Sequence, residues 1–136
     1  MPTLLLDTCA VIFIADDQRI EQPARREIAS ASATDGVLVS PVSAWEIGLL
    51  AVKRGLAFVP DPKTWFNDFL ASPGVRLAPL TPDIAIESSF LPLPLHADPA
   101  DRLLIATARA LTVPIVTRDE RILAYARAGF LAALPC

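Results

Sequence analysis

Short apolar runs alternate along the chain with longer segments that have helical spacing. Apolar and β-branched residues at 3–6, 36–40 and 113–117 predict buried strands, and 75–80 is a weaker strand candidate. Residues 130–136 suggest a short edge strand. Capping residues and apolar residues three or four apart predict helices between these runs. The predicted helices cover residues 9–15, 21–33, 43–55, 60–74, 81–91, 98–111 and 121–129.

Strands that alternate with helices predict an α/β domain, with a mostly parallel central sheet flanked by helices on both sides. The chain has 136 residues, which is enough for one buried core and too few for two ordinary domains. No repeat or low-complexity linker divides it. We therefore expect a single domain over residues 1–136.

The composition is unusually apolar for a chain of this size. Hydrophobic residues make up 53% of the sequence and the mean hydropathy is +0.46, so we expect apolar surface that a partner or a second copy covers. No apolar run reaches the roughly 20 residues of a membrane-spanning helix. Asp7 interrupts the first apolar run, which argues against a signal peptide and favours a cytoplasmic protein. Cys9 and Cys136 predict reduced thiols rather than a disulfide framework.

Carboxylates follow the predicted strands at the points where parallel strands end. Asp7 comes directly after the first strand, and Asp119 follows the last buried strand with one residue between. Glu46 lies six residues after the second strand, while Asp98 and Asp101 begin the helix that leads into the last buried strand. Because ligands of a doubly wound sheet bind beyond the carboxyl ends of its strands, we expect all five side chains at one edge.

Most of these acids also have a structural explanation. Asp98 has the residue type of an N-cap, and Asp101 falls where a carboxylate reaches back to free amides at the helix start. Glu46 completes a Ser-x-x-Glu capping box on Ser43. Asp119 precedes a helix that it can cap. Capping and metal binding are therefore both open for these four acids.

Asp7 ends a buried strand, where a carboxylate needs a hydrogen-bond donor or a cation. Several acids on one rim without matching lysines repel one another, and a divalent metal removes that repulsion. Carboxylates in this number suit Mg²⁺ or Mn²⁺, which activate water for attack on a phosphodiester. The net charge of −3 does not indicate nucleic-acid binding, but bound cations would reverse the local field. The arrangement predicts nuclease chemistry, with a metal-dependent phosphatase and a non-catalytic scaffold that binds RNA or protein as alternatives.

Four motifs in this order resemble those of the PIN domain, and more narrowly those of VapC-type toxins from bacterial toxin-antitoxin pairs. They are LLLDT, VSAWEI, HADPADRLLIATA and IVTRDE, and the similarity spans residues 4–134. The resemblance implies a ribonuclease that depends on Mg²⁺ or Mn²⁺ and cuts within RNA. It also implies a homodimer or a larger assembly, and a cognate antitoxin that keeps the enzyme silent.

The resemblance assigns roles to single residues. The four family acids, which act as catalytic residues and metal ligands, correspond to Asp7, Glu46, Asp101 and Asp119, and Asp98 matches an auxiliary acid of one branch. Hydroxyl and guanidinium side chains beside these acids are candidate RNA contacts, with solvated charges or ion pairs as the alternative for the arginines. These candidate contacts are Thr8, Arg102, Thr117, Arg118 and Arg121.

Other polar and aromatic positions carry weaker signals. Related WEI motifs often have a lysine four residues after the glutamate, and Leu50 stands there in this chain. His96 has the chemistry of a general acid or base, but its proline-rich loop favours a structural or surface role. Trp45 and Trp65 are able to stack on bases, yet their apolar neighbours favour packing.

Overall fold

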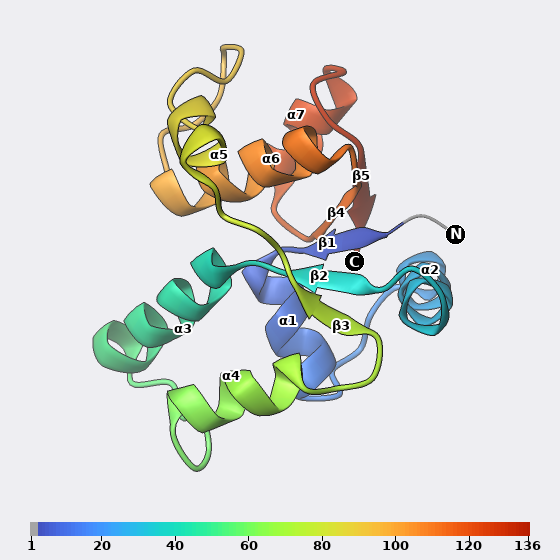
Figure 1. Cartoon of the computed structure of the whole chain (residues 1–136), viewed down its shortest axis with the longest axis vertical. Coiled ribbons are helices and arrows are strands. Elements are labelled where there is room, and N and C mark those ends of the chain that lie inside the picture. The colour runs from blue at the N-terminus through green and yellow to red at the C-terminus, as the bar shows by residue number, and fades with distance from the viewer. Residues whose placement is uncertain (1–2) are drawn as a thin grey trace.

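The computed structural model describes residues 3–136 and has a parallel sheet at its centre. The strand order is β3-β2-β1-β4-β5, and every neighbouring pair runs parallel. The strands are β1 (Leu4–Leu6), β2 (Val37–Val39), β3 (Val75–Leu77), β4 (Ile115–Thr117) and β5 (Ala133–Pro135). The predicted α/β architecture is confirmed (Figure 1).

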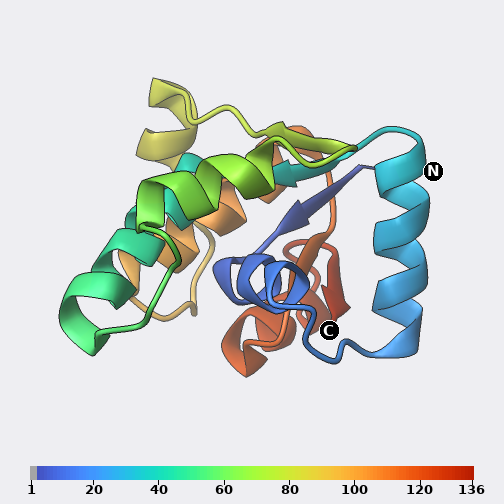
Figure 2. The same cartoon turned by 90° about the horizontal axis from the view of Figure 1, so that it is seen from below.

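Helices connect the strands and surround the sheet. They are α1 (Thr8–Ala15), α2 (Gln22–Ala33), α3 (Pro41–Arg54), α4 (Pro62–Leu70), α5 (Pro82–Glu87), α6 (Pro99–Leu111) and α7 (Glu120–Arg127). In both views α2 and α3 lie at opposite ends of the molecule, while α5 lies at the same end as α3 (Figures 1 and 2). In residues 3–136 no helix has the length and apolar character that crossing a membrane requires.

Alternation along the strands divides the apolar core between the two faces of the sheet. Leu4 and Leu6 of β1 pack into one cluster with side chains of α1, α2, α3 and α4. Leu5 points to the other face, where it packs with side chains of α5, α6 and α7. All three leucines are almost completely buried. Because both faces of this central strand are covered, its sequence is an uninterrupted run of apolar residues.

The strand order reverses at β1, and this reversal positions the site. β1 lies between β2 and β4, with Leu6 paired to Val39 on one side and to Val116 on the other. The chain leaves β1 toward β2 and returns later to β4, so the segments after β1 and β4 diverge around a common edge. Such a switch point is where open α/β sheets bind ligands.

The start of α3 corrects one prediction. The helix begins at Pro41, and Ser40 is the N-cap, with its hydroxyl accepting from the Val42 amide at 3.0 Å. Ser43 lies inside the helix and is buried, so the predicted capping box with Glu46 does not form. Proline fits the first helical position because that residue needs no amide donor, which moves the helix start ahead of Ser43.

Candidate metal centre

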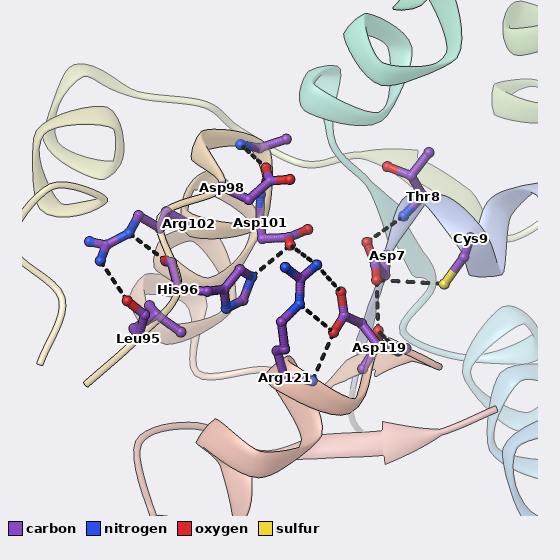
Figure 3. Close-up of polar contacts among 12 residues, drawn as sticks. Asp7, Thr8, Cys9, Leu95, His96, Asp98, Asp101, Arg102, Asp119 and Arg121 are labelled. Carbon is purple, nitrogen blue, oxygen red and sulfur yellow. Dashed lines mark hydrogen bonds and ion pairs between the residues drawn. The ribbon is translucent and has the colours of Figure 1, made fainter. Parts of the chain in front are cut away.

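Four segments bring five carboxylates to the carboxyl edge of the sheet. Asp7 caps α1 directly after β1, and Asp119 caps α7 two residues after β4. Asp98 caps α6, with Asp101 in its first turn, and Glu46 lies in the second turn of α3. Charge repulsion shows that these segments are close: Asp119 raises the pKa of Asp7, and Asp7, Asp101 and Asp98 raise the pKa of Glu46. Figure 3 shows Asp7, Asp98, Asp101 and Asp119 side by side.

Asp7 is the most completely enclosed member of the group. It is 5% exposed, and burial raises its pKa above the ordinary value. Its Oδ1 accepts from the Thr8 amide at 2.8 Å, and its Oδ2 accepts from the Thr117 hydroxyl at 2.6 Å and from the Cys9 thiol at 3.5 Å. The Thr117 oxygen in turn accepts from the Asp119 amide at 3.0 Å. One buried hydroxyl thus fixes Asp7 against the backbone that carries Asp119.

Glu46 is tied to the same network through Thr8. The Thr8 hydroxyl donates to Oε1 of Glu46 at 2.5 Å, and the Ser43 hydroxyl lies 2.9 Å from the Thr8 oxygen. Burial is the largest cause that raises the pKa of Glu46, to about 7, and repulsion from Asp7 and Asp101 adds to it. Ser43 is a contributor that the sequence pattern assigned to a helix cap instead.

Asp101 and His96 form the closest polar pair on the other side of the site. Nε2 of His96 lies 2.7 Å from Oδ2 of Asp101. Asp101 as a residue is 7% exposed. Burial raises the pKa of Asp101, and the contact with His96 opposes that shift. One ligand atom each from His96, Asp101 and Asp119 lies within 4.8 Å of the other two, which makes this cluster a candidate cation site. The sequence pattern placed His96 in a structural or surface role, and the structure places it on a proposed ligand.

Asp98 has the capping role that its position predicts. Its Oδ1 accepts from the amides of Ala100 at 2.9 Å and Asp101 at 3.2 Å. This cap fixes the first turn of α6 and therefore the direction of Asp101.

Comparison with known proteins decides the family. The model of the PIN domain matches residues 4–128. The chain belongs to the PIN domain family. This PIN domain is 32% identical to Ribonuclease VapC22 of Mycobacterium tuberculosis (strain ATCC 25618 / H37Rv) over 123 residues, which is 90% of this chain and 91% of the relative. The resemblance inferred from the four motifs is therefore confirmed.

Solved structures show the same fold at low sequence identity. The PIN domain described here superposes on a chain of VapBC2 from Rickettsia felis, bound to a promoter DNA fragment, with a TM-score of 0.65 and 11% identity over 98% of both chains. It also superposes on VapBC-5 from Mycobacterium tuberculosis, a toxin-antitoxin system, with a TM-score of 0.62 and 18% identity over 100% of both chains. Identities this low establish the fold alone.

Two of the candidate RNA contacts of this PIN domain face the acids instead of the solvent. Thr117 is completely buried, and its hydroxyl donates to Asp7. Thr8 is 6% exposed, and its hydroxyl donates to Glu46. These two side chains therefore hold carboxylates in place, and Thr117 has no surface to offer an RNA strand in this structure.

Arg102 and Arg118 are held by backbone carbonyl groups. The Arg102 guanidinium donates to the carbonyl oxygens of His96, Leu95 and Ser88, and in Figure 3 it lies on the far side of His96 from Asp119. Arg102 thus fixes the loop that carries His96 and does not face the acids.

The Arg118 guanidinium donates to the carbonyl oxygens of Arg19 and Cys136, and it lies 4.0 Å over the ring of Phe13. Arg118 and Arg19 line a groove of about 940 Å³ beside the site, together with Arg25. The sequence pattern did not indicate Arg19 or Arg25, because both lie about a hundred residues before Arg118 in the chain.

The residues present fit a hard divalent cation. The five carboxylates supply oxygen donors, which suit Mg²⁺ or Mn²⁺, and the one imidazole contacts the carboxylate of Asp101. Two of the acids, Asp7 and Asp101, are buried with raised pKa values, as carboxylates without a matching cation should be. Within residues 3–136, the ion pairs of the five acids involve only His96 and Arg121.

Proposed function

We propose that this protein is a metal-dependent endoribonuclease that hydrolyses phosphodiester bonds within RNA. The observation that supports the proposal is that carboxylates from four segments converge at one edge of the sheet. Burial and mutual repulsion raise the pKa of three of these carboxylates, those of Asp7, Glu46 and Asp101. Membership of the PIN domain family supports it, as does the 32% identity to a relative named as a ribonuclease. A cytoplasmic location fits an enzyme that acts on cellular RNA.

The cation in this proposal is Mg²⁺ or Mn²⁺, held by Asp7, Glu46, Asp101 and Asp119. The grouping of Asp101 and Asp119 with His96 supports two of these ligands. The repulsion that Asp7 and Glu46 experience from the other acids supports the remaining two. A bound divalent cation lowers the pKa of a water molecule and offsets negative charge on the oxygens of the phosphate. The four acids would therefore act both as metal ligands and, through that cation, as the catalytic set.

The hydroxyl groups of Thr8 and Thr117 serve as positioning groups in this scheme. Each donates to one carboxylate oxygen, at 2.5 Å for Glu46 and 2.6 Å for Asp7. The second oxygen of Glu46 and the remaining lone pairs of the Asp7 oxygens are then left to bind a cation. Buried carboxylates that accept such bonds hold one orientation, which reduces the reorganisation required when the metal binds.

Arg118, Arg19 and Arg25 form the proposed path for the RNA backbone beside the metal centre. All three are exposed and line one groove, which Glu21 and Glu120 also line. Arg118 and Glu120 are the chain neighbours of Asp119, so this groove begins beside the metal centre. Guanidinium groups suit phosphate because their donors match two oxygens at once. Arg102 is left out of this path because it is only partly exposed and its Nε, Nη1 and Nη2 all donate to backbone carbonyls, whereas both carbonyls that Arg118 binds accept from its Nη2.

The test is a cleavage assay on RNA with purified protein. Wild type should cut RNA with Mg²⁺ or Mn²⁺ and lose activity in excess chelator. Asp7→Asn and Asp101→Asn should both lose cleavage by at least roughly a hundredfold while keeping a folded circular dichroism spectrum. Asp83→Asn is the matched control, because Asp83 is an exposed acid in α5 outside the site.

Two further measurements separate the alternatives. Hydrolysis of a small phosphomonoester in preference to RNA would indicate a metal-dependent phosphatase. Failure to bind Mn²⁺ in calorimetry would indicate a scaffold that only binds RNA or protein. Full RNA cleavage in excess chelator would contradict the proposal itself.

We also propose a cognate antitoxin and a homodimer as partners. Large apolar side chains stand exposed on α3, on α5 and in the segment after α5, and they include Trp45, Val52, Ile86, Phe90 and Leu93. Such surface is more typical of an interface than of a monomer. The shared fold with VapBC-5 of Mycobacterium tuberculosis, a member of the VapBC family of toxin-antitoxin systems, supports the antitoxin. Analytical ultracentrifugation of wild type and of Phe90→Glu would test the dimer, which the substitution should dissociate.

A further inference from the structure

Arg121 reaches across the candidate cation site. It lies two residues after Asp119 at the start of α7, and its Nη2 is 3.0 Å from Oδ2 of Asp119 and 3.6 Å from Oδ2 of Asp101. Its Nε is 3.3 Å from Oδ1 of Asp119. Figure 3 shows the guanidinium between these two aspartates. The positive charge of Arg121 therefore stands against two of the three residues that form the candidate cation cluster.

The side chain of Arg121 is free to leave this position. It is 59% exposed, so little packing is lost when it moves. Asp119 and Asp101 are its only side-chain partners within residues 3–136. Arg121 itself lines a groove of about 410 Å³ together with His96, Tyr125 and other residues, and this groove gives the side chain room to turn. Arg102 differs in this respect, because three backbone carbonyls hold it.

A divalent cation and this guanidinium compete for the same carboxylates. Mg²⁺ binds carboxylate oxygens at about 2.1 Å and keeps several waters around it. A guanidinium in contact with the same oxygens occupies that space and repels the incoming charge. The displaced guanidinium is still positively charged and still has N–H donors that match two oxygens at once. In a nuclease with RNA bound, the nearest anion for it is a phosphate of the RNA strand.

We propose that Arg121 is an exchangeable counter-cation of the site: it pairs with Asp101 and Asp119 when no metal is bound, and it moves to a phosphate of the RNA when a divalent cation takes its place. The proposal rests on the proposed function, since it requires a metal centre at these acids. Under this proposal metal binding and RNA binding strengthen each other. The metal takes the place of Arg121 at the two aspartates, and the RNA phosphate pairs with the guanidinium that the metal has displaced. Arg121 is then a substrate-positioning residue whose place depends on the metal.

Calorimetric titration with Mn²⁺ in the absence of RNA tests the first half of the exchange. Arg121→Gln should bind Mn²⁺ roughly three- to tenfold more tightly than wild type, because the competing charge is gone. Arg127→Gln is the matched control: Arg127 is exposed on the same helix and pairs with Glu120. Its Mn²⁺ affinity should equal that of wild type. Equal or weaker binding by Arg121→Gln would overturn the inference.

Nuclear magnetic resonance of the arginine Nε–H groups tests the movement directly. The Arg121 signal, assigned by its loss in Arg121→Gln, should shift when Mg²⁺ is added to wild type. A signal that stays unchanged at saturating Mg²⁺ would show that the guanidinium keeps its place, which also overturns the inference. The second half of the exchange predicts a higher KM for RNA in Arg121→Gln at saturating Mg²⁺, with a smaller change in kcat. An unchanged KM would contradict the phosphate contact.

The outcomes separate this inference from the proposed function. Wild type that binds no Mn²⁺ overturns the metal centre, and the inference with it. Wild type that binds Mn²⁺ as tightly as Arg121→Gln overturns the inference alone and leaves the nuclease proposal standing.

Discussion

Glu46→Gln should stabilise the metal-free protein at neutral pH, although it removes a proposed metal ligand. Burial and neighbouring acids raise the pKa of Glu46 from 4.5 to about 7, so the charged carboxylate is disfavoured in the folded state. Between these two values the folded chain binds more protons at this position than the unfolded chain, and its stability falls as pH rises. Gln has the same shape and keeps an oxygen that accepts from the Thr8 hydroxyl, but it carries no charge.

The expected size follows from the shift and from the exposure of the side chain. For a group fully shielded from water, a pKa difference of this size lowers the free energy of unfolding by about 3 kcal/mol when the carboxylate is charged. Glu46 is only partly buried, and solvent screening reduces the gain for Glu46→Gln at pH 7.5 to about 1–2 kcal/mol. In a chain of this length that gain corresponds to roughly 3–8 °C in Tm.

Urea unfolding followed by circular dichroism, with chelator present, measures the difference at a series of pH values. The two proteins should converge at about pH 4, where Glu46 is protonated in both the folded and the unfolded wild-type chain. Saturating Mn²⁺ should reduce or reverse the difference in unfolding free energy between the two proteins at pH 7.5, because only wild type has the full set of ligands. A mutant that is less stable than wild type at pH 7.5 without metal would refute the reasoning, and so would a difference that does not depend on pH.

Three further substitutions test other parts of the structure. Gly74→Ala should destabilise the fold by more than about 1 kcal/mol in urea unfolding, because φ is +79° and a Cβ would lie 2.2 Å from the Ser32 carbonyl oxygen. Thr117→Val keeps the shape but removes the buried donor to Asp7, and should cost about 1–3 kcal/mol and weaken Mn²⁺ binding in calorimetry. Asp98→Asn keeps a capping oxygen, so stability should change by less than about 0.5 kcal/mol, and unchanged Mn²⁺ affinity would identify a cap without a ligand role.

Matched controls keep these three results interpretable. Gly129→Ala also has a positive φ, of +96°, but nothing lies within 4 Å of the added Cβ, so its cost measures the backbone alone. Thr107→Val serves for Thr117→Val, because Thr107 is equally buried but donates only to a helix carbonyl. Asp98→Ala removes the cap and should cost about 0.5–2 kcal/mol where Asp98→Asn does not.

The convergence of the acids was predictable because it depends on topology more than on detail. Parallel strands end at one edge, so the positions of Asp7 and Asp119 after two predicted strands placed both acids on the same edge. Their close approach follows from the pairing of β1 with β4, which the structure shows and the sequence did not predict. The cap of α6 was equally predictable, since an aspartate followed by proline and a second acid is a strong local signal for a helix start. Both predictions used positions along the chain and needed no side-chain geometry.

The partners of each acid were not predictable, because they depend on contacts between distant segments. His96 reaches Asp101 because Arg102 of α6 binds the carbonyl groups of Leu95 and His96, and no periodic pattern encodes those bonds. Ser43 and Glu46 form a plausible capping box in sequence, but the serine at position 40 and the proline after it start the helix earlier. The Ser40–Pro41 pair, three residues before Ser43, therefore determines where the helix starts.

The two ways of holding a carboxylate at this edge divide the acids into two kinds. Asp7, Asp98 and Asp119 are N-caps, so backbone amides at the positive end of a helix offset part of their charge with or without metal. Glu46 and Asp101 lie inside helices and depend on side chains of other segments instead. The capping acids are therefore maintained by the fold itself, while the acids inside helices gain most when a cation arrives. Capping and metal binding are not competing explanations here, because the caps fix the directions from which the remaining ligands reach the metal.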